Sequence, residues 1–318
     1  MPSVVYNISH WKDLDGIASA AIIHRYCLLN NIPVQHMLAS PHNVHEKLRN
    51  LNKKCKGRNA YLYITDIGLD EDIASDVVGY LKELKSRSWR IYWFDHHVWD
   101  YDVEAKVSSI VDKLVIDRSK CAAEICYEQV LPEDEIAKRL AELARDMDFW
   151  IKREELSVKL SKVLSTGYDR YKLISILARG IFWNNELEKT YRKAVEREEK
   201  LLKKALSKVQ IVKVDNLKVA IVKSNIPAGL IADILAKEGV DIIAVVSCRG
   251  TVSLRRGNKS INLLPIAKKL HGGGHPYAAG GNLGYNIFDK FLARLGFYRK
   301  LNLIVNAVKA SLNEIMED

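Results

Sequence analysis

The sequence predicts an α/β protein in which a parallel β-sheet, covered by helices on both faces, precedes a smaller α/β domain. The chain of 318 residues has the length of about two ordinary domains. In its first half, short runs rich in Val, Ile and Tyr alternate with segments of helical periodicity, a pattern typical of right-handed crossovers between parallel strands. A highly charged helical stretch then separates this half from a second set of strand-like runs.

The expected elements of the first half follow from composition and periodicity. Strands are expected at Val4–Ser9, Pro33–Ala39, Ala60–Thr65 and Arg90–Phe94. Helical spacing covers Gly16–Leu29 and Asp70–Lys85. A clearer amphipathic helix is expected over Glu133–Trp150, because its apolar residues follow the 3.6-residue period: Ile136, Leu140, Leu143 and Met147.

The second half begins with helical segments and returns to strands. The stretch 189–208 is almost entirely charged and predicts a solvated linker helix with i,i+4 ion pairs. We therefore expect a first domain over 1–188, the linker over 189–208 and a second domain over 209–318. The elements expected in the second domain are strands at Val209–Val214, Leu217–Val222, Asp241–Ser247 and Thr251–Arg255, a helix at Pro227–Lys237, a glycine-rich segment and a helical tail over Ile287–Met316.

Composition and charge narrow the function classes. An apolar content of 48% and a charged content of 28% exclude a disordered chain. The 49 Lys and Arg residues exceed the 39 Asp and Glu residues, and the net charge of +10 favours an anionic partner, although a solvated basic surface would give the same count. No apolar run is long enough to span a bilayer, the N-terminus lacks signal-peptide features, and the five cysteines are scattered. These features predict a soluble cytoplasmic protein with no membrane partner.

Three clusters of acidic or histidine residues follow three of the expected strands: Ser9–Gly16, Ile64–Asp66 and Phe94–His97. The carboxyl ends of parallel strands share one edge of a sheet, so these clusters are expected to meet. Carboxylate oxygens mixed with imidazoles suit Mn²⁺ or Mg²⁺, and converging carboxylates would repel one another without a cation. Taken singly, each cluster could be a helix cap or a turn. Their coincidence at three strand ends favours a metal site.

Two ordered sets of motifs resemble a known family. Asp95-His96-His97 after a hydrophobic strand, with His10, Asp13-x-Asp15-Gly16 and Asp66 upstream, resembles the DHH phosphoesterase superfamily. Downstream, the run Gly272–Gly280 (GGGHPYAAG) resembles the Gly-Gly-Gly-His signature of the DHH-associated domain, and Leu254-Arg255 matches that domain's arginine strand. The combination resembles the branch of RecJ-like exonucleases, nanoRNases and cyclic-dinucleotide phosphodiesterases. It differs from the pyrophosphatases of the superfamily, which carry another second domain.

The resemblance implies a catalytic first domain with two Mn²⁺ ions, for which Mg²⁺ is a possible substitute. His10 and Asp13 would bind one ion, Asp15, His96 and Asp146 the other, and Asp66 would bridge them. Asp95 would orient an imidazole from behind the ligands, and His97 would contact a ligand or the scissile phosphate. Two residues separate His10 from Asp13, where many members of the family have three. Asp148 rivals Asp146, which is preferred because it matches the helix-borne acid of the family.

The second domain would bind substrate through Arg255, Gly273, Gly274 and His275. Consecutive glycines let backbone N–H groups approach a phosphate, and the two cationic side chains would add charge-assisted donors; a plain tight turn is the alternative. Trp11, inside the first motif, is a candidate base-stacking residue.

The resemblance thus implies an exonuclease acting on single-stranded DNA or RNA and short oligonucleotides, with release from the 3′ end as the expected polarity. A small-nucleotide phosphatase or cyclic-dinucleotide phosphodiesterase with the same metals is the alternative enzyme. A nucleic-acid binder with a degenerate site is the non-enzymatic alternative. The sequence identifies no protein partner.

Overall fold

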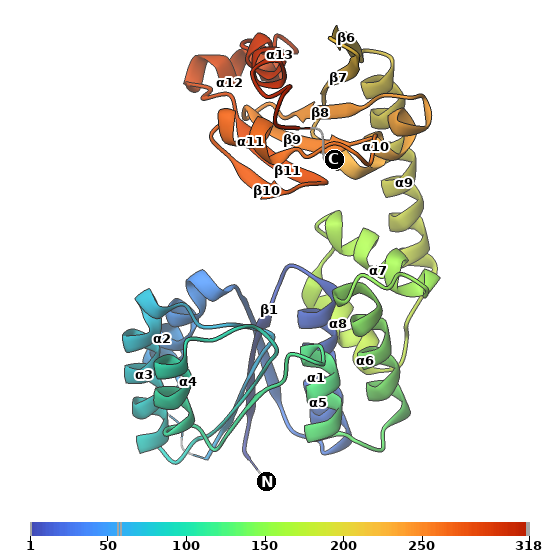
Figure 1. The fold of residues 1–318 in the computed structure, drawn as a ribbon. Helices are drawn as coiled ribbons and strands as arrows, with labels where there is room; N and C mark the ends of the chain where they lie inside the picture. The colour runs from blue at the N-terminus through green and yellow to red at the C-terminus, as the bar shows by residue number, and fades with distance from the viewer. Residues whose placement is uncertain (1, 56, 58, 316–318) are drawn as a thin grey trace. The chain divides into compact units, whose positions relative to one another are not determined.

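A computed structural model describes residues 2–55, 57 and 59–315 and divides the chain into two compact units, Met1–Ala194 and Val195–Asp318 (Figure 1). The division falls inside α9 (Asn185–Leu206), the helix that the charged stretch 189–208 predicts. Acidic residues in its first turn and lysines in its last turn complement the helix dipole. Each unit has its own sheet and its own hydrophobic core.

The first unit contains a five-stranded sheet with every neighbouring pair parallel and the order β2-β1-β3-β4-β5. Its strands are β1 (Val5–His10), β2 (Val34–Ala39), β3 (Tyr61–Thr65), β4 (Arg90–Asp95) and β5 (Lys113–Ile116). The three central strands, β1, β3 and β4, are largely buried. Burial on both faces explains their nearly continuous apolar sequences.

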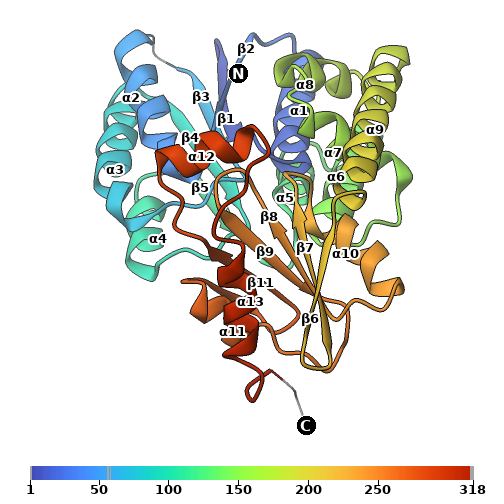
Figure 2. The same cartoon turned by 90° about the horizontal axis from the view of Figure 1, so that it is seen from above.

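Helices cover both faces of this sheet, as predicted (Figure 1, Figure 2). One face carries α1 (Leu14–Leu29), α5 (Ala122–Val130), α6 (Glu135–Asp148), α7 (Glu155–Ser165) and α8 (Arg170–Ala178). The other carries the short η1 (Pro41–Asn43), α2 (Val44–Lys54), α3 (Glu71–Ser86) and α4 (Tyr101–Ser108). Each layer buries its own apolar cluster against the sheet, and this arrangement confirms the expected fold class.

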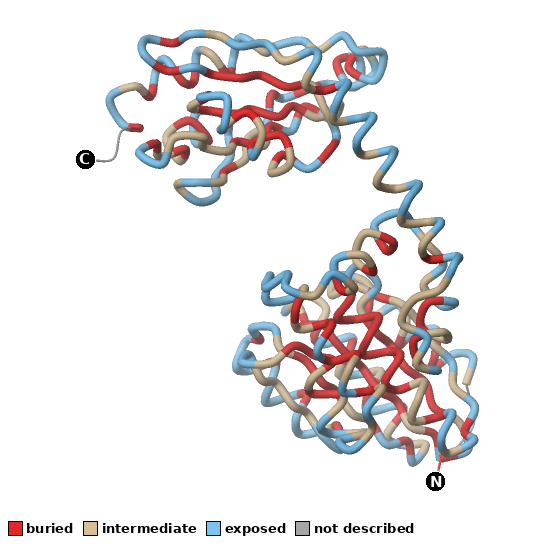
Figure 3. Tube along the Cα trace, turned by 90° about the vertical axis from the view of Figure 1, so that its right-hand side faces the viewer, coloured by how far each residue is buried: buried red, intermediate tan, exposed pale blue. Residues whose placement is uncertain are grey.

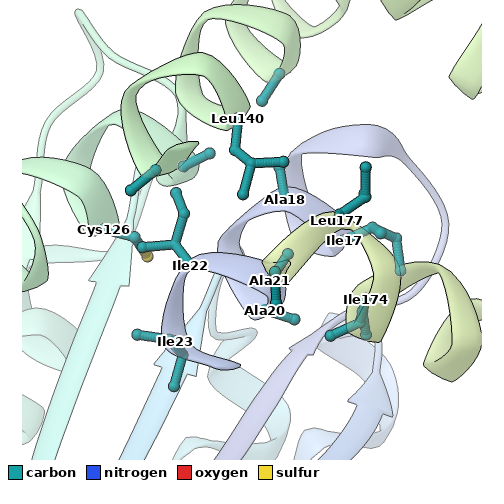
Figure 4. Packing of buried hydrophobic residues seen from close by; sticks show 14 of the residues in the cluster. Ile17, Ala18, Ala20, Ala21, Ile22, Ile23, Cys126, Leu140, Ile174 and Leu177 are labelled. Atoms are coloured by element: carbon teal, nitrogen blue, oxygen red, sulfur yellow. The ribbon is translucent and has the colours of Figure 1, made fainter. Parts of the chain in front are cut away.

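Helix α1 is the centre of its layer because neighbours surround it (Figure 4). Its small residues Ala18, Ala20 and Ala21 are fully buried, and Ile22 packs toward Cys126 of α5. Small side chains on a helix allow close approach of the flanking helices, here α5, α6 and α8. The start of α1 is therefore held firmly where it meets the end of β1.

The second unit contains a six-stranded mixed sheet with the order β10-β11-β9-β8-β7-β6, in which β7 and β8 are parallel and the other pairs antiparallel. Its elements are β6 (Gln210–Val214), β7 (Leu217–Lys223), α10 (Ala228–Lys237), β8 (Ile242–Val246), β9 (Thr251–Arg256), α11 (Leu264–Lys269), β10 (Gly273–His275), β11 (Ala278–Asn282), α12 (Ile287–Arg294) and α13 (Asn302–Lys309). Buried positions gather in the interior of each unit (Figure 3).

The structure differs from the sequence expectations in several elements. The helical tail expected over Ile287–Met316 is two helices, α12 and α13, because Gly296 takes a φ of +95° between them; Met316 lies outside the described residues. The sequence analysis did not identify α2, α4, α5 or β5. Within the residues that the structure describes, no helix has the length and hydrophobicity needed to cross a bilayer.

Candidate metal centre

The three predicted clusters meet at the carboxyl edge of the first sheet. His10 is the last residue of β1, Asp66 directly follows β3, and Asp95 is the last residue of β4. The strand order places β1 between β2 and β3. The chain therefore runs from β1 to β2 on one side and then returns past β1 to β3 on the other. Open α/β sheets bind ligands at the carboxyl ends of strands beside such a reversal. The side chains of these three strands therefore converge at the expected place.

The turn between β1 and α1 shapes the first group of side chains. Asp13 is the N-cap of α1 and accepts a hydrogen bond from the Gly16 backbone N–H at 3.2 Å. A Cβ on Gly16 would lie 2.3 Å from the carbonyl oxygen of His10. Glycine is thus required here, because the helix begins in direct contact with the end of the strand.

Within this group, His10 lies between two carboxylates. Its Nδ1 is 3.0 Å from Asp13 Oδ2 and 3.4 Å from Asp66 Oδ2. Asp66 has a φ of +56°, a left-handed conformation that Asp tolerates better than most residues. His10 Nδ1 and Asp66 Oδ2 are buried and have no hydrogen-bond partner among the described residues. Buried polar atoms are seldom left unpartnered, and a cation would satisfy both.

The second group is built around His96. Its Nε2 lies 3.4 Å from Asp66 Oδ1 and 3.7 Å from Asp15 Oδ2, and its Nδ1 lies 3.6 Å from Asp148 Oδ2. Among the described residues, three sets of side chains could each hold a cation: His10, Asp13 and Asp66; Asp66, His96 and His97; and Asp15, His96 and Asp148. Asp66 contacts His10 and His96 through different oxygens. Asp66 therefore lies between the two histidines.

The electrostatics of the cluster show an excess of negative charge. Burial, then repulsion from Asp66 and Asp148, raises the pKa of Asp15 well above its usual value. Burial also raises the pKa values of Asp66 and Asp148. Burial opposes protonation of His10, but the close carboxylates of Asp13 and Asp66 raise its pKa to about 10. Two buried carboxylates with a third beside them need positive charge, and divalent cations would supply it.

Asp15 is held by a contact that the sequence analysis missed. Its two carboxylate oxygens accept hydrogen bonds from the backbone N–H groups of Ala122 and Ala123, at 2.8 and 2.7 Å. These groups form the first turn of α5, a helix whose N-terminus carries partial positive charge. Each oxygen has a second lone pair, so the anchored carboxylate can still bind a cation.

Asp95 and His97 form a separate pair beside the cluster. Asp95 is fully buried, and its Oδ1 lies 2.8 Å from Nδ1 of His97, while its Oδ2 accepts a hydrogen bond from Trp99 Nε1 at 2.6 Å. The Asp95 contact, partly opposed by burial, raises the pKa of His97. Asp95 thus fixes the orientation of the half-exposed His97 ring.

The structure does not bring the preferred Asp146 into the cluster but does bring in its rival Asp148. The Asp146 carboxylate accepts hydrogen bonds from the backbone N–H groups of Arg153 and Glu154 at 2.9 and 3.2 Å, and from the Ser157 hydroxyl. It folds the chain that follows α6. Asp148, the last residue of that helix, is the side chain that reaches His96.

A buried hydrogen-bond network lies behind the cluster. The Thr65 hydroxyl donates to Ser9 Oγ at 2.8 Å, and Ser9 donates to the Gly16 carbonyl at 2.6 Å. Asn7 donates to Thr65 Oγ1 at 3.3 Å and contacts His36, which in turn contacts His24, both at 3.0 Å. The network joins residues next to His10, Asp66 and Asp15. Isolated Ser, Thr and Asn residues within strands gave no sequence signal for it.

The glycine-rich motif of the second unit forms a β-hairpin. His275 pairs with Ala278, and Ala278 pairs with Arg255 on the next strand, so these three residues are aligned across β10, β11 and β9. A Cβ on Gly272 would lie 1.9 Å from the Gly280 carbonyl oxygen, and Gly274 has a φ of +138°. Hairpin geometry thus explains these two glycines. Gly273 is exposed and a Cβ there would meet no atom within 4 Å, so local packing does not require it.

Comparisons with known proteins agree with this geometry. Residues 207–298 match the DHHA1 domain family. A crystal structure of exonuclease RecJ bound to manganese is similar over 98% of this chain and 90% of its own, with 14% identity and a TM-score of 0.54. RecJ from Thermus thermophilus in complex with Mn²⁺ is similar over 96% of this chain and 52% of its own, with 15% identity and a TM-score of 0.52. No curated protein matches the chain.

These matches confirm the resemblance on which the sequence analysis rests. Residues 207–298 form a DHHA1 domain, and the chain as a whole shares its fold with RecJ, in agreement with the resemblance to the DHH phosphoesterase superfamily. At this level of identity the structural likeness establishes the fold. The residues that would bind metal and substrate rest on the geometry of this chain.

Proposed function

We propose that the chain is a Mn²⁺-dependent phosphodiesterase that degrades single-stranded DNA or RNA, including short oligonucleotides, from the 3′ end. One observation carries the proposal: two carboxylate–imidazole groups share Asp66 at the carboxyl edge of a parallel sheet. In enzymes that cleave phosphate esters, side chains arranged in this way commonly bind a pair of divalent cations. The RecJ structures of similar fold are complexes with Mn²⁺.

We assign the residues as follows. His10 and Asp13 would hold one cation, Asp15, His96 and Asp148 the other, and Asp66 would serve both. When bound, such a pair supplies Lewis acidity toward a phosphoryl oxygen and lowers the pKa of water. The unpartnered His10 Nδ1 and Asp66 Oδ2 support this fit. Mg²⁺ suits the same oxygen-rich set.

His97 has a different role in this proposal. Asp95 holds the His97 ring in one orientation, and Trp99 in turn donates a hydrogen bond to Asp95. The ring remains half-exposed beside Asp66. A raised pKa favours the imidazolium form, which donates a charge-assisted hydrogen bond. We therefore assign His97 to the scissile phosphate, where it would stabilise the charge that develops as the ester bond breaks.

The DHHA1 domain would bind the substrate strand. Alignment of Arg255 with His275 across the sheet places two potential cationic donors near the open backbone of Gly273. Such a surface fits a phosphate, because a phosphate accepts hydrogen bonds from both side chains and backbone. This supports substrates that carry phosphates beyond the one being cleaved.

A substrate-length series in Mn²⁺ tests the proposal. We expect end-labelled DNA or RNA to be shortened stepwise from the 3′ end, and a blunt duplex to resist. The Michaelis constant of a twenty-mer should rise with salt more steeply than that of a dinucleotide, since the log–log slope is about −0.7 per neutralised phosphate. Equal and shallow salt dependence, with turnover limited to a cyclic dinucleotide or mononucleotide, would instead establish the small-nucleotide alternative. Salt-dependent binding without any turnover would establish a non-enzymatic binder.

A further inference from the structure

We propose that three exposed aromatic residues beside the metal cluster, Trp11, Phe149 and Trp150, form an aromatic rim that stacks the unpaired bases of the substrate strand. This inference rests on the proposed function and specifies which substrate feature the first unit recognises. According to this inference, the protein recognises the bases of the substrate in addition to its phosphates. The three residues are exposed by 41%, 40% and 70%, respectively.

The rim residues directly follow two residues of the cluster in the chain. Trp11 follows His10, and Phe149 and Trp150 follow Asp148. A chain of short contacts joins these two ligands: His10 to Asp66 at 3.4 Å, Asp66 to His96 at 3.4 Å, and His96 to Asp148 at 3.6 Å. Aromatic residues therefore follow the residues at both ends of this chain of contacts, next to the place where the phosphate of a strand would bind.

The turn that carries Trp150 is held in an unfavourable conformation. Trp150 and Lys152 have φ values of +57° and +54°, in the left-handed region that non-glycine residues rarely adopt. The Asp146 carbonyl oxygen accepts hydrogen bonds from the backbone N–H groups of Ile151 and Lys152 at 2.9 and 3.1 Å. The Asp146 carboxylate binds the next two N–H groups, those of Arg153 and Glu154. The chain thus presents a large apolar ring to solvent on a fixed turn, a common feature of binding sites.

Each ring of the rim is paired with a cation. Lys152 Nζ lies 3.1 Å from the Trp150 ring centroid, and the guanidinium groups of Arg145 and Arg170 lie 4.5 and 5.0 Å from those of Phe149 and Trp11. Arg170 also donates a hydrogen bond to the Trp11 carbonyl at 2.6 Å. Even with Lys152 in place, 70% of Trp150 remains exposed. Aromatic rings interspersed with cations are the composition that binds single strands, because rings stack on bases and cations attract phosphates.

The test separates base recognition from phosphate recognition. Fluorescence anisotropy would measure the affinities of a labelled thymidylate six-mer and of an abasic six-mer with the same number of phosphates, in a chelator that prevents cleavage. We expect the wild-type protein to prefer the thymidylate by about tenfold. Trp150→Ala should remove most of this preference, Trp11→Ala part of it, and Trp150→Phe should retain it, because a ring remains. Phe297→Ala is the matched control, since Phe297 is 67% exposed on the second unit.

The outcomes distinguish the aromatic rim from the proposed function. A wild-type protein without base preference, or alanine variants that melt like the wild type and keep the preference, would overturn the rim even if Mn²⁺-dependent cleavage occurs. Loss of the preference in Trp150→Ala but not in Phe297→Ala would support the rim. That support would hold even if a parallel assay with Mn²⁺ showed no cleavage, which would reject the proposed function alone.

Discussion

The acid–histidine cluster of the first unit and the glycine hairpin of the second are built in opposite ways. The cluster buries ionisable side chains: Asp15 and Asp66 are each 2% exposed, and polar atoms of His10 and Asp66 remain unpartnered. The hairpin exposes its backbone, and Gly273 to His275 all lie at the surface. Charge repulsion in the cluster costs stability, whereas the two constrained glycines of the hairpin satisfy local backbone requirements, a close strand approach at Gly272 and a positive φ at Gly274.

This difference separates two kinds of function. A buried set of repelling carboxylates is stable only with compensating positive charge, so the cluster indicates a ligand that neutralises it. An exposed hairpin gains no comparable stability when a ligand binds. Its residues affect only how tightly the substrate is bound. Substitutions in the two regions should therefore change different measured quantities.

The largest effect is expected at the residue shared by the two ligand groups. Asp66→Ala removes oxygens that contact both His10 and His96, and we expect turnover in Mn²⁺ to fall by more than about a hundredfold, since even groups behind metal ligands cost 10–100-fold. Asp76→Ala, on the exposed face of α3, is the control. Turnover by Asp66→Ala within a fewfold of the wild type, at saturating Mn²⁺, would refute the assignment of Asp66.

The neighbouring acids at the end of α6 should separate stability from activity. Asp146→Ala leaves two partly buried backbone donors and the Ser157 hydroxyl without their acceptor, and we expect it to lower the free energy of unfolding by roughly 2–3 kcal/mol. Asp148→Ala should abolish turnover and leave the metal-free melting temperature equal or higher, because Asp148 repels Asp15. Denaturant melts in a chelator, with activity assays alongside, measure both. An active Asp148→Ala variant would return Asp146 to consideration as the ligand.

Substitutions in the hairpin test the other half of the comparison. His275→Ala and Arg255→Ala should each raise the Michaelis constant of an oligonucleotide by about tenfold, the effect of losing one charge-assisted hydrogen bond. Neither residue belongs to a ligand group in the structure, so calorimetric Mn²⁺ binding should not change. Weaker Mn²⁺ binding in either variant would contradict the division of labour between the two units.

The smallest effect concerns stability at mild acid pH, in the network behind the cluster. Burial, together with the neighbouring His24, lowers the pKa of His36 to about 3. This value lies below the pKa of about 6.5 in the unfolded chain, so the unfolded state binds more protons between these limits. The stability from neutral His36 is thus present above about pH 6.5 and is lost as the pH falls toward 3.

A His36→Gln variant separates the contribution of His36 to the pH dependence of stability from the contributions of the other titrating groups. The melting temperature of His36→Gln should fall less steeply between pH 6.5 and 4.5 than that of the wild type, because glutamine does not titrate in this range. Both proteins would be measured in a chelator, so that metal binding does not enter. Identical slopes would show that His36 takes up no proton in this range.

Much of this fold could be predicted because the strands are apolar and the helices periodic. β5 was missed because it has only four residues, Lys113–Ile116, and begins with a lysine. α5 was missed although its first turn anchors Asp15, because residues Ala122 and Ala123 carry no polar pattern. Contacts between elements distant in sequence leave such weak local signals.

The site was predictable where the ligands follow strands and ambiguous where they lie on a helix. His10, Asp66 and His96 converge because strand ends share an edge. Asp146 and Asp148 are two residues apart, about 200° around a helix, so only one can face the cluster. Asp146 lies three residues after buried Leu143 and is itself buried. Its partners, however, are the backbone groups of a turn whose left-handed conformation the sequence does not show.

We infer that Asp66 joins two cation sites. Anomalous diffraction at the manganese edge, from crystals soaked in Mn²⁺, would locate these sites. We expect two anomalous difference peaks about 3.5–4 Å apart. One should lie beside His10 and Asp13, the other beside Asp15, His96 and Asp148, with Asp66 in contact with both. A single peak, or a peak bound by Asp146 in place of Asp148, would contradict it.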